Sequence, residues 1–133
     1  MALWLVVAAV LGIGENVPEL SLDGPRILNI KAGAAAKGAR KLAEFRARLE
    51  GEVSSPASYY CLTEEWDWDD GSVSLAEPDC DPYEPGDEVT REFQESHYFG
   101  PGQYIITLRL LDGDEVAAKA VHELRVYGSA LLQ

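Results

Sequence analysis

The sequence predicts an all-β domain in which two antiparallel sheets pack as a sandwich. Polar and apolar residues alternate in several short segments, most clearly at Tyr104, Ile106, Leu108 and Leu110, and this period of two is that of a half-buried strand. Turn-forming residues separate the segments, and helical patterns do not alternate with them. Short strands joined by turns are typical of two packed antiparallel sheets.

The first two strands are predicted by different signals. A strand at 26–31 follows the turn signal Asp23-Gly24-Pro25. Residues 32–43 are rich in alanine and glycine, and we expect a loop or an edge strand there because glycine weakens a helix. A strand at 43–50 alternates cleanly. Its core face consists of Phe45, Ala47 and Leu49.

The tryptophan-bearing strand is expected at 59–69. Trp66 and Trp68 lie two residues apart, so both indoles point to the core. Regular alternation also places Glu64 on that face. Either Glu64 lies beyond the edge of the core, or a bulge changes the phase of the strand.

Three further strands complete the prediction. A strand at 89–99 runs into the turn Gly100-Pro101-Gly102, and the strand at 104–110 ends at the turn 111–114. The last strand, at 116–127, returns along it. One possible inner face of this last strand consists of Ala118, Ala120, His122, Leu124 and Val126.

The N-terminus carries an uncharged apolar run. The run from Leu3 to Ile13 is shorter than the roughly 20 residues that a membrane-spanning helix needs, and it fits a secretory signal. The alternatives are a retained segment that docks into a membrane or a partner, and a buried first strand. We therefore expect a signal peptide or hydrophobic anchor at 1–14. The remaining units are a linker at 15–24, the sandwich at 25–128 and a tail at 129–133.

Cys61 and Cys80 are the only cysteines, and their spacing does not match a zinc site. We expect a disulfide, which would contribute about 3 kcal/mol by restricting the unfolded chain. It would join an acidic insertion at 73–88 to the tryptophan-bearing strand and would indicate an oxidising, extracytoplasmic compartment. The alternative is two free thiols.

The charge of the chain excludes some partners. A net charge of −12 and a pI near 4.4 argue against nucleic acid and against anionic lipid, because both are bound by clustered lysine and arginine. Neutral partners, cationic partners and partners bridged by divalent ions remain open.

Acidic residues crowd the region from Glu64 to Glu95, where Arg91 is the only cation. Calcium takes several carboxylate oxygens, so this region could bind it, although the spacing is not that of an EF-hand. The alternative is a solvated acidic loop that keeps the protein soluble. The candidate calcium ligands are Asp67, Asp69, Asp79, Asp81 and Asp87.

Catalytic chemistry has little support in the sequence. No pair of carboxylates is singled out for glycoside hydrolysis, and neither His97 nor His122 accompanies a nucleophile motif. We expect a protein that is not an enzyme and has no cofactor other than, at most, calcium. Four aromatic residues could stack on sugars or enter a partner's pocket, or could pack locally against loops. They are Tyr59, Tyr83, Tyr98 and Phe99.

Two motifs in order resemble a known family. Trp66-Asp67-Trp68-Asp69-Asp70-Gly71-Ser72 is followed by His97-Tyr98 and by Pro101-Gly102-Gln103-Tyr104, and an alternating strand then ends at Asp112-Gly113-Asp114. This arrangement resembles the PKD domain of the polycystic kidney disease protein. Asp69 lies where the family most often has glycine. The match departs from the family pattern at His97, which Tyr98 follows directly, and at the acidic, cysteine-containing insertion that separates the two motifs. The motif residues are Trp66, Trp68, Asp70, Gly71, His97, Tyr98, Pro101, Gly102 and Tyr104.

The resemblance implies an immunoglobulin-like sandwich in which His97 stabilises a turn by hydrogen bonding. It also implies a secreted, periplasmic or cell-surface module that contacts protein or polysaccharide. The alternative function is an accessory structural subunit of a membrane-bound or filamentous assembly, docked through residues 1–14.

Overall fold

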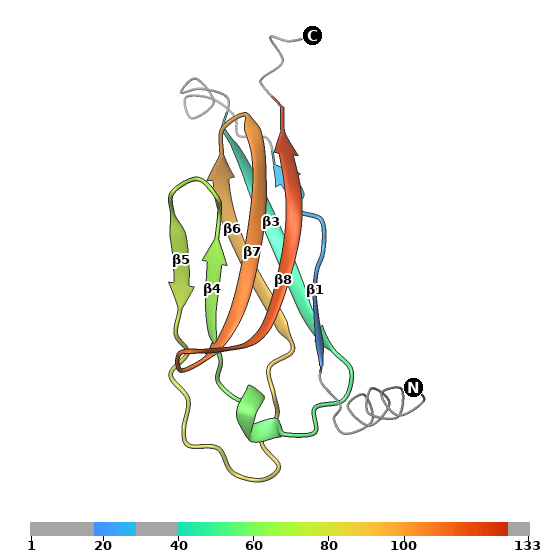
Figure 1. The fold of residues 1–133 in the computed structure, drawn as a ribbon, viewed down its shortest axis with the longest axis vertical. Helices are drawn as coiled ribbons and strands as arrows, with labels where there is room; N and C mark the ends of the chain where they lie inside the picture. The colour runs from blue at the N-terminus through green and yellow to red at the C-terminus, as the bar shows by residue number, and fades with distance from the viewer. Residues whose placement is uncertain (1–17, 29–39, 128–133) are drawn as a thin grey trace, which may run out of the picture.

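The computed structural model describes residues 18–28 and 40–127. In these ranges the chain forms two antiparallel sheets packed face to face (Figure 1), which confirms the predicted all-β sandwich. The predictions for residues 1–14, for the end of the 26–31 strand and for most of the alanine-rich segment lie outside the described residues.

The first sheet is arranged around a long central strand. β3 (Lys41–Glu50) pairs on one side with β1 (Glu19–Leu22) and β2 (Arg26–Leu28), and on the other side with β6 (Glu92–Phe99). Residues 23–25 interrupt the edge between β1 and β2, and the register against β3 shifts by one residue there. The predicted turn is therefore an irregularity in one edge, after which the chain continues in the same direction.

The expected linker at 15–24 is wrong for its second half. Glu19–Leu22 pairs along β3, and Leu20 is buried in the core. Leu20 and Leu22 alternate with polar neighbours, which is the strand period that the linker prediction overlooked. The sandwich therefore begins before residue 25.

The second sheet has the order β5-β4-β7-β8. β4 (Thr63–Asp67) lies between β5 (Val73–Ala76) and β7 (Gly102–Asp112), and β7 also pairs with β8 (Glu115–Val126). The chain passes from β6 in one sheet to β7 in the other at Pro101, and β7 turns into β8 at Gly113, whose φ of 65° suits glycine.

The expected bounds of one strand and of the insertion need correction in this sheet. The strand expected at 59–69 spans only Thr63–Asp67. It begins late because η2 (Pro56–Tyr59) precedes it and Cys61 has a φ of 62°, which a strand cannot accommodate, and it ends before Asp69, whose φ is also 62°. The insertion expected at 73–88 begins later, because Val73–Ala76 forms β5.

Aromatic rings fill the space between the sheets. Trp66 and Trp68 are fully buried, and their rings stack with centroids 5.3 Å apart. Phe45 from the first sheet packs on both. The predicted core faces of the strands at 43–50 and 104–110 are confirmed, except that Tyr104 is only half-buried. Phe99, a candidate exposed aromatic, is 1% exposed and belongs to the core.

Glu64 lies on the tryptophan face and β4 has no bulge, so the explanation by a bulge is wrong. Glu64 is half-buried and is not part of the buried core, which agrees with the other explanation, a position at the edge of the core. Its Oε1 accepts a hydrogen bond from Trp66 Nε1 at 3.0 Å. Partial burial raises the pKa of the Glu64 carboxyl. The Trp66 hydrogen bond opposes that rise, and repulsion from Glu95 in the first sheet adds to it.

Candidate functional site

The carboxylates in the turn that follows β4 accept hydrogen bonds from backbone amides. Asp67 Oδ1 accepts from the amide of Asp69 at 3.0 Å, and Asp70 Oδ1 accepts from the amide of Ser72 at 3.0 Å. Asp69 Oδ2 reaches the amide of Ile105 on β7 at 2.9 Å. These local bonds make a tight turn, and the Asp69 bond ties it to the next strand of the sheet.

Asp69 has a φ of 62°, in the left-handed region that favours glycine. Aspartate is one of the few other residues that tolerates this conformation. Here its side chain also supplies the bond to Ile105.

Asp70 connects the two sheets. Its Oδ2 lies 2.8 Å from His97 Nε2 on β6, and both side chains are largely shielded from solvent. The imidazole stacks on Trp68 with a centroid distance of 4.6 Å and an interplanar angle of 4°. His97 therefore lies between a core indole and the carboxylate of the turn.

Hydrogen bonding lowers the pKa of the Asp70 carboxyl. Partial burial alone would raise the pKa of its carboxyl, but hydrogen bonds from the Ser72 hydroxyl, from His97 and from the Ser72 amide outweigh burial, and the pKa is lowered. The carboxylate form is thus the one that the turn stabilises.

Ser72, His97 and Asp70 have the composition of a catalytic triad but not its geometry. In a triad the acid binds one imidazole nitrogen and the serine binds the other. Here Asp70 Oδ2 and Ser72 Oγ both face Nε2, at 2.8 and 3.4 Å, and the Ser72 hydroxyl donates to Asp70. This arrangement secures a turn and does not activate a nucleophile.

The five candidate calcium ligands are not gathered at one place. Asp67 and Asp69 accept backbone hydrogen bonds in the turn, and Asp87 Oδ2 accepts from the amide of Glu84 at 2.8 Å. Asp79 and Asp81 are exposed in the loop after β5. Among residues 18–28 and 40–127, no group of three or more histidine, cysteine or acidic side chains could hold a metal ion. Calcium binding stays a prediction.

The predicted disulfide is confirmed: Cys61 and Cys80 are bonded, with their Cα atoms 6.1 Å apart. It anchors the acidic loop beside the start of β4. Within this region Tyr60 packs edge-on against Tyr83, with ring centroids 5.2 Å apart. Desolvation raises the pKa of the Tyr60 hydroxyl, and the charges of Asp87, Asp81 and Glu84 raise it further.

The other motif residues lie around the passage between the sheets. The Tyr104 hydroxyl donates to the carbonyl of Gly100 at 2.9 Å, and a Cβ added to Gly102 would approach that hydroxyl to 3.2 Å. Tyr98 points outward from β6 and is 48% exposed. Tyr59 packs against the core instead of facing solvent.

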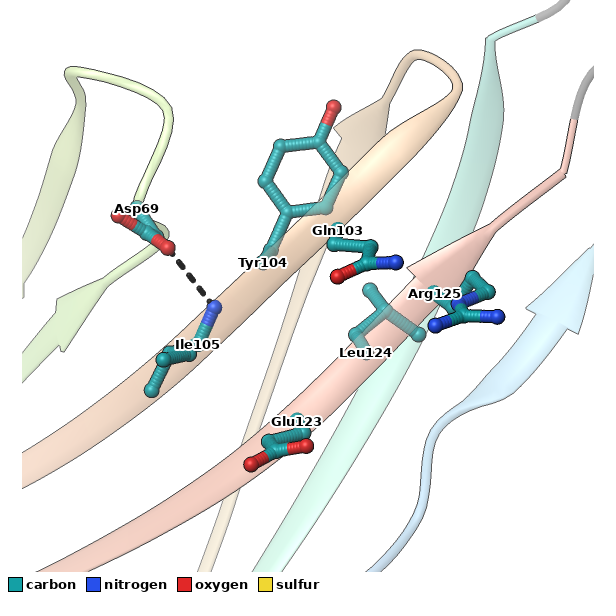
Figure 2. Close-up of a pocket in the computed structure, with 7 residues that line it drawn as sticks. All are labelled: Asp69, Gln103, Tyr104, Ile105, Glu123, Leu124 and Arg125. Carbon is teal, nitrogen blue, oxygen red and sulfur yellow. Dashed lines mark hydrogen bonds between the residues drawn. The ribbon is translucent and has the colours of Figure 1, made fainter.

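An open groove of about 370 Å³ lies on the outer face of the second sheet, past the end of β4. Figure 2 shows Asp69 reaching across to the amide of Ile105, with Glu123 and Arg125 projecting from the neighbouring β8. The lining is polar and includes charges of both signs. A small-molecule site is usually a more enclosed and more apolar cavity, so this groove fits a contact surface better.

The same outer face carries exposed apolar side chains. Val73 and Leu75 on β5 are 53% and 62% exposed, and Ile105 and Val121 are each about half exposed. The strand register aligns Val73, Asp67, Thr107 and Val121 in one row across the sheet. An Arg109–Glu65 ion pair of 3.2 Å lies in the next row. We call this set, Val73, Leu75, Ile105 and Val121, the outer apolar set.

The outer apolar set was missed at the sequence level because residues 73–88 were treated as one acidic insertion. The alternation Val73-Ser74-Leu75-Ala76 directly after Asp70-Gly71 is a hairpin signal that could have revealed β5. Which side of the strand faces solvent follows only from its register with β4.

No helix in the described part of the chain is long and apolar enough to cross a membrane. Comparisons with protein-family models, curated proteins and solved structures found no match to this chain.

Proposed function

We propose that this protein is a non-catalytic, extracytoplasmic recognition module that binds a protein partner through the outer face of its β5-β4-β7-β8 sheet. The observation that carries the proposal is the outer apolar set. Its members share one face as two pairs, Val73 with Leu75 and Ile105 with Val121, and polar residues of β4 and β7 lie between the pairs. Exposed apolar side chains that share one face are candidates for an interaction site. A glycan partner is less well supported, because none of these four side chains is an aromatic ring on which a sugar could stack.

The immunoglobulin-like subclass belongs to this proposal. Three features support it: the buried Trp66 on β4 with Trp68 just after it, sheets that separate β1, β2, β3 and β6 from β5, β4, β7 and β8, and the bond from Tyr104 back to Gly100. A buried tryptophan and a tyrosine that bonds to upstream backbone are hallmarks of immunoglobulin sandwiches.

The compartment and the lack of catalysis rest on separate observations. The Cys61–Cys80 disulfide supports an oxidising environment, because cytosolic reductants keep most thiols reduced. The binding of both Ser72 and Asp70 to the same nitrogen of His97 supports a structural use of these three residues.

Site-specific photo-crosslinking in the producing cells tests the function. A photoreactive residue at Val121 is expected to form a discrete adduct with a protein, and purified unlabelled domain should suppress it. The matched control is the same residue at Arg46, which is exposed on the outer face of the first sheet. Equal adducts at both positions, adducts with glycan only, or no adduct at Val121 would contradict the proposal.

A further inference from the structure

One edge of the second sheet is formed by β5. Among residues 18–28 and 40–127, β5 pairs with β4 on one side and with no strand on the other, and it lies at the edge of the sheet in Figure 1. The amide of Trp68 donates to the carbonyl of Ser72 at 3.2 Å, and antiparallel pairs alternate between bonded and non-bonded positions from there. Ser74 therefore directs its backbone groups toward β4, whereas Val73 and Leu75 direct theirs away from the sheet.

The edge thus presents outward-directed backbone groups and exposed apolar side chains at the same residues. Val73 and Leu75 present backbone N–H and C=O groups to the edge, and their side chains are more than half exposed on the outer face. An added strand can bond to such backbone groups and place alternate side chains beside the apolar ones. Natural sheets protect an edge with short strands, charge, proline or a bulge. β5 is short, with four residues, but Val73-Ser74-Leu75-Ala76 contains neither charge nor proline.

Charge identifies the chemistry of the partner. β5 lies within a span, from Arg48 to Arg91, that has no lysine or arginine between its ends. The loop that follows β5 is exposed and acidic, and its carboxylates include Glu77, Asp79 and Asp81. A strand that pairs with β5 therefore passes a negative surface, which attracts a cationic segment and repels an anionic one.

The same charges disfavour a second copy of this chain as the occupant. Antiparallel pairing of two β5 strands would place the acidic loop of each copy beside the Asp69-Asp70 turn of the other. Parallel pairing would bring the two acidic loops together. Each chain carries a net charge of −12, so either arrangement adds repulsion.

We infer that β5 is a docking edge for an extended, lysine- or arginine-containing segment of a partner protein, which adds to the sheet as a fifth strand. The inference rests on the proposed function and specifies the partner of that same face. Apolar residues at alternate positions of the segment would contact Val73 and Leu75, and its cations would face the loop after β5.

The probe is a short fluorescent peptide that alternates valine with lysine, measured by fluorescence anisotropy against the full chain. We expect saturable binding that weakens as salt is raised, because the attraction between exposed charges is screened. A peptide with glutamate in place of lysine should bind at least about tenfold more weakly. A peptide with N-methylated valines should lose binding, since it cannot donate to the edge.

Two variants of one position separate backbone pairing from side-chain contact. Leu75→Pro removes the outward N–H, and proline is tolerated in edge strands, so we expect binding to weaken about tenfold or more. Leu75→Thr keeps the N–H and the strand preference, so a smaller loss of about threefold is expected. If Leu75→Pro does not fold, the N-methylated peptide on the unaltered protein provides the same test.

Three results would overturn the inference. The valine–lysine and valine–glutamate peptides could bind equally, the valine–lysine peptide could bind Leu75→Pro as well as it binds wild type, or it could fail to bind the protein. The inference would also be overturned if the wild-type protein formed a dimer that the Leu75→Pro substitution dissociates, because the strand added to β5 would then come from a second copy. Crosslinking of a protein at Val121 in any of these cases would leave the proposed function standing. If the peptide does not bind and no protein is crosslinked at Val121, both the inference and the proposed function are refuted.

Discussion

At the scale of single residues, Asp70 is the group through which the turn after β4 contacts the opposite sheet. Its folded pKa lies below that of the unfolded chain, which is about 3.9 for aspartate. The stability that it contributes is therefore present above the unfolded pKa and is lost as the pH falls through the folded pKa. Acid should weaken this link between the sheets.

We predict that Asp70→Asn lowers the free energy of unfolding at pH 7 by about 1–2 kcal/mol, because a charged acceptor is lost from the His97 and Ser72 bonds. The difference from wild type should shrink as the pH falls below about 4. Urea unfolding at several pH values measures it. His97→Phe is the matched control, since phenylalanine keeps an aromatic ring stacked on Trp68 and removes the hydrogen bond to Asp70. A difference that does not depend on pH would contradict the assignment.

Glu64 shows the opposite pH dependence. Its folded pKa is raised, so ionisation costs stability above that pKa, and the cost disappears once the pH is below the unfolded value. We predict that Glu64→Gln, which keeps an acceptor for Trp66 Nε1, stabilises the protein at pH 7 by about 0.5 kcal/mol and has no effect near pH 3. Thermal melts at both pH values measure it. Destabilisation at pH 7 would show that Trp66 needs the charged acceptor.

Asp69 combines a left-handed backbone with a bond to the next strand. We predict that Asp69→Ala costs about 2 kcal/mol, because alanine loses the bond to the Ile105 amide and disfavours a φ of 62°. Asp69→Gly should cost less, since it loses only the bond, and Asp69→Asn should cost least. Urea unfolding of the three variants gives the order. Equal losses for glycine and alanine would show that the backbone conformation contributes nothing.

At the scale of elements, the disulfide connects the acidic loop to the start of β4. We predict that the double variant Cys61→Ser, Cys80→Ser loses about 3 kcal/mol of stability, chiefly because the unfolded chain gains freedom. Urea unfolding measures the loss, and reduced wild-type protein is the control. β4 and β7 should stay paired in the variant, because their register does not involve the loop. Loss of the whole fold would show that the loop is needed to form β4.

Individual strands differ in how far local sequence predicts them. β3 and β7 alternate cleanly over many residues, and their core faces were predictable for that reason. β1 and β5 have only four residues each, too few for the pattern to stand out from a linker or an acidic loop. The start of β4 depends on the left-handed backbone conformation at Cys61, and the pattern of polar and apolar residues around Cys61 does not indicate that conformation.

At the scale of the whole molecule, the compartment can be checked on the natural protein. We predict that intact-mass measurement finds a chain without residues 1–14, as expected for a cleaved secretory signal. The same spectrum should show a mass lower by two hydrogens than that of the reduced protein, because Cys61 and Cys80 are bonded. A chain that keeps Met1 would exclude simple secretion and favour the anchored accessory subunit.

The candidate site was only partly predictable from sequence. The turn at Asp69 and Asp70 and the disulfide were recognised, because turn chemistry and cysteine number are local properties. The contact of Asp70 with His97 joins residues far apart in the chain, on facing sheets. The outer apolar set likewise needs strand register, which is a property of pairs of strands.

The sequence by itself determined the strand periods, the tryptophan-bearing core face, the net negative charge and a single pair of cysteines, because none of these depends on how the strands pair. Only the tertiary structure decided which groups the carboxylates of the acidic turn bind. It places the carboxylates of Asp67 and Asp69 on backbone amides within the turn and the same sheet, and it places the Asp70 carboxylate on His97, where it links the two sheets. It also decided that β5 ends the sheet with an edge that no other strand of the described residues pairs with, because an edge exists only once the order of the strands is set.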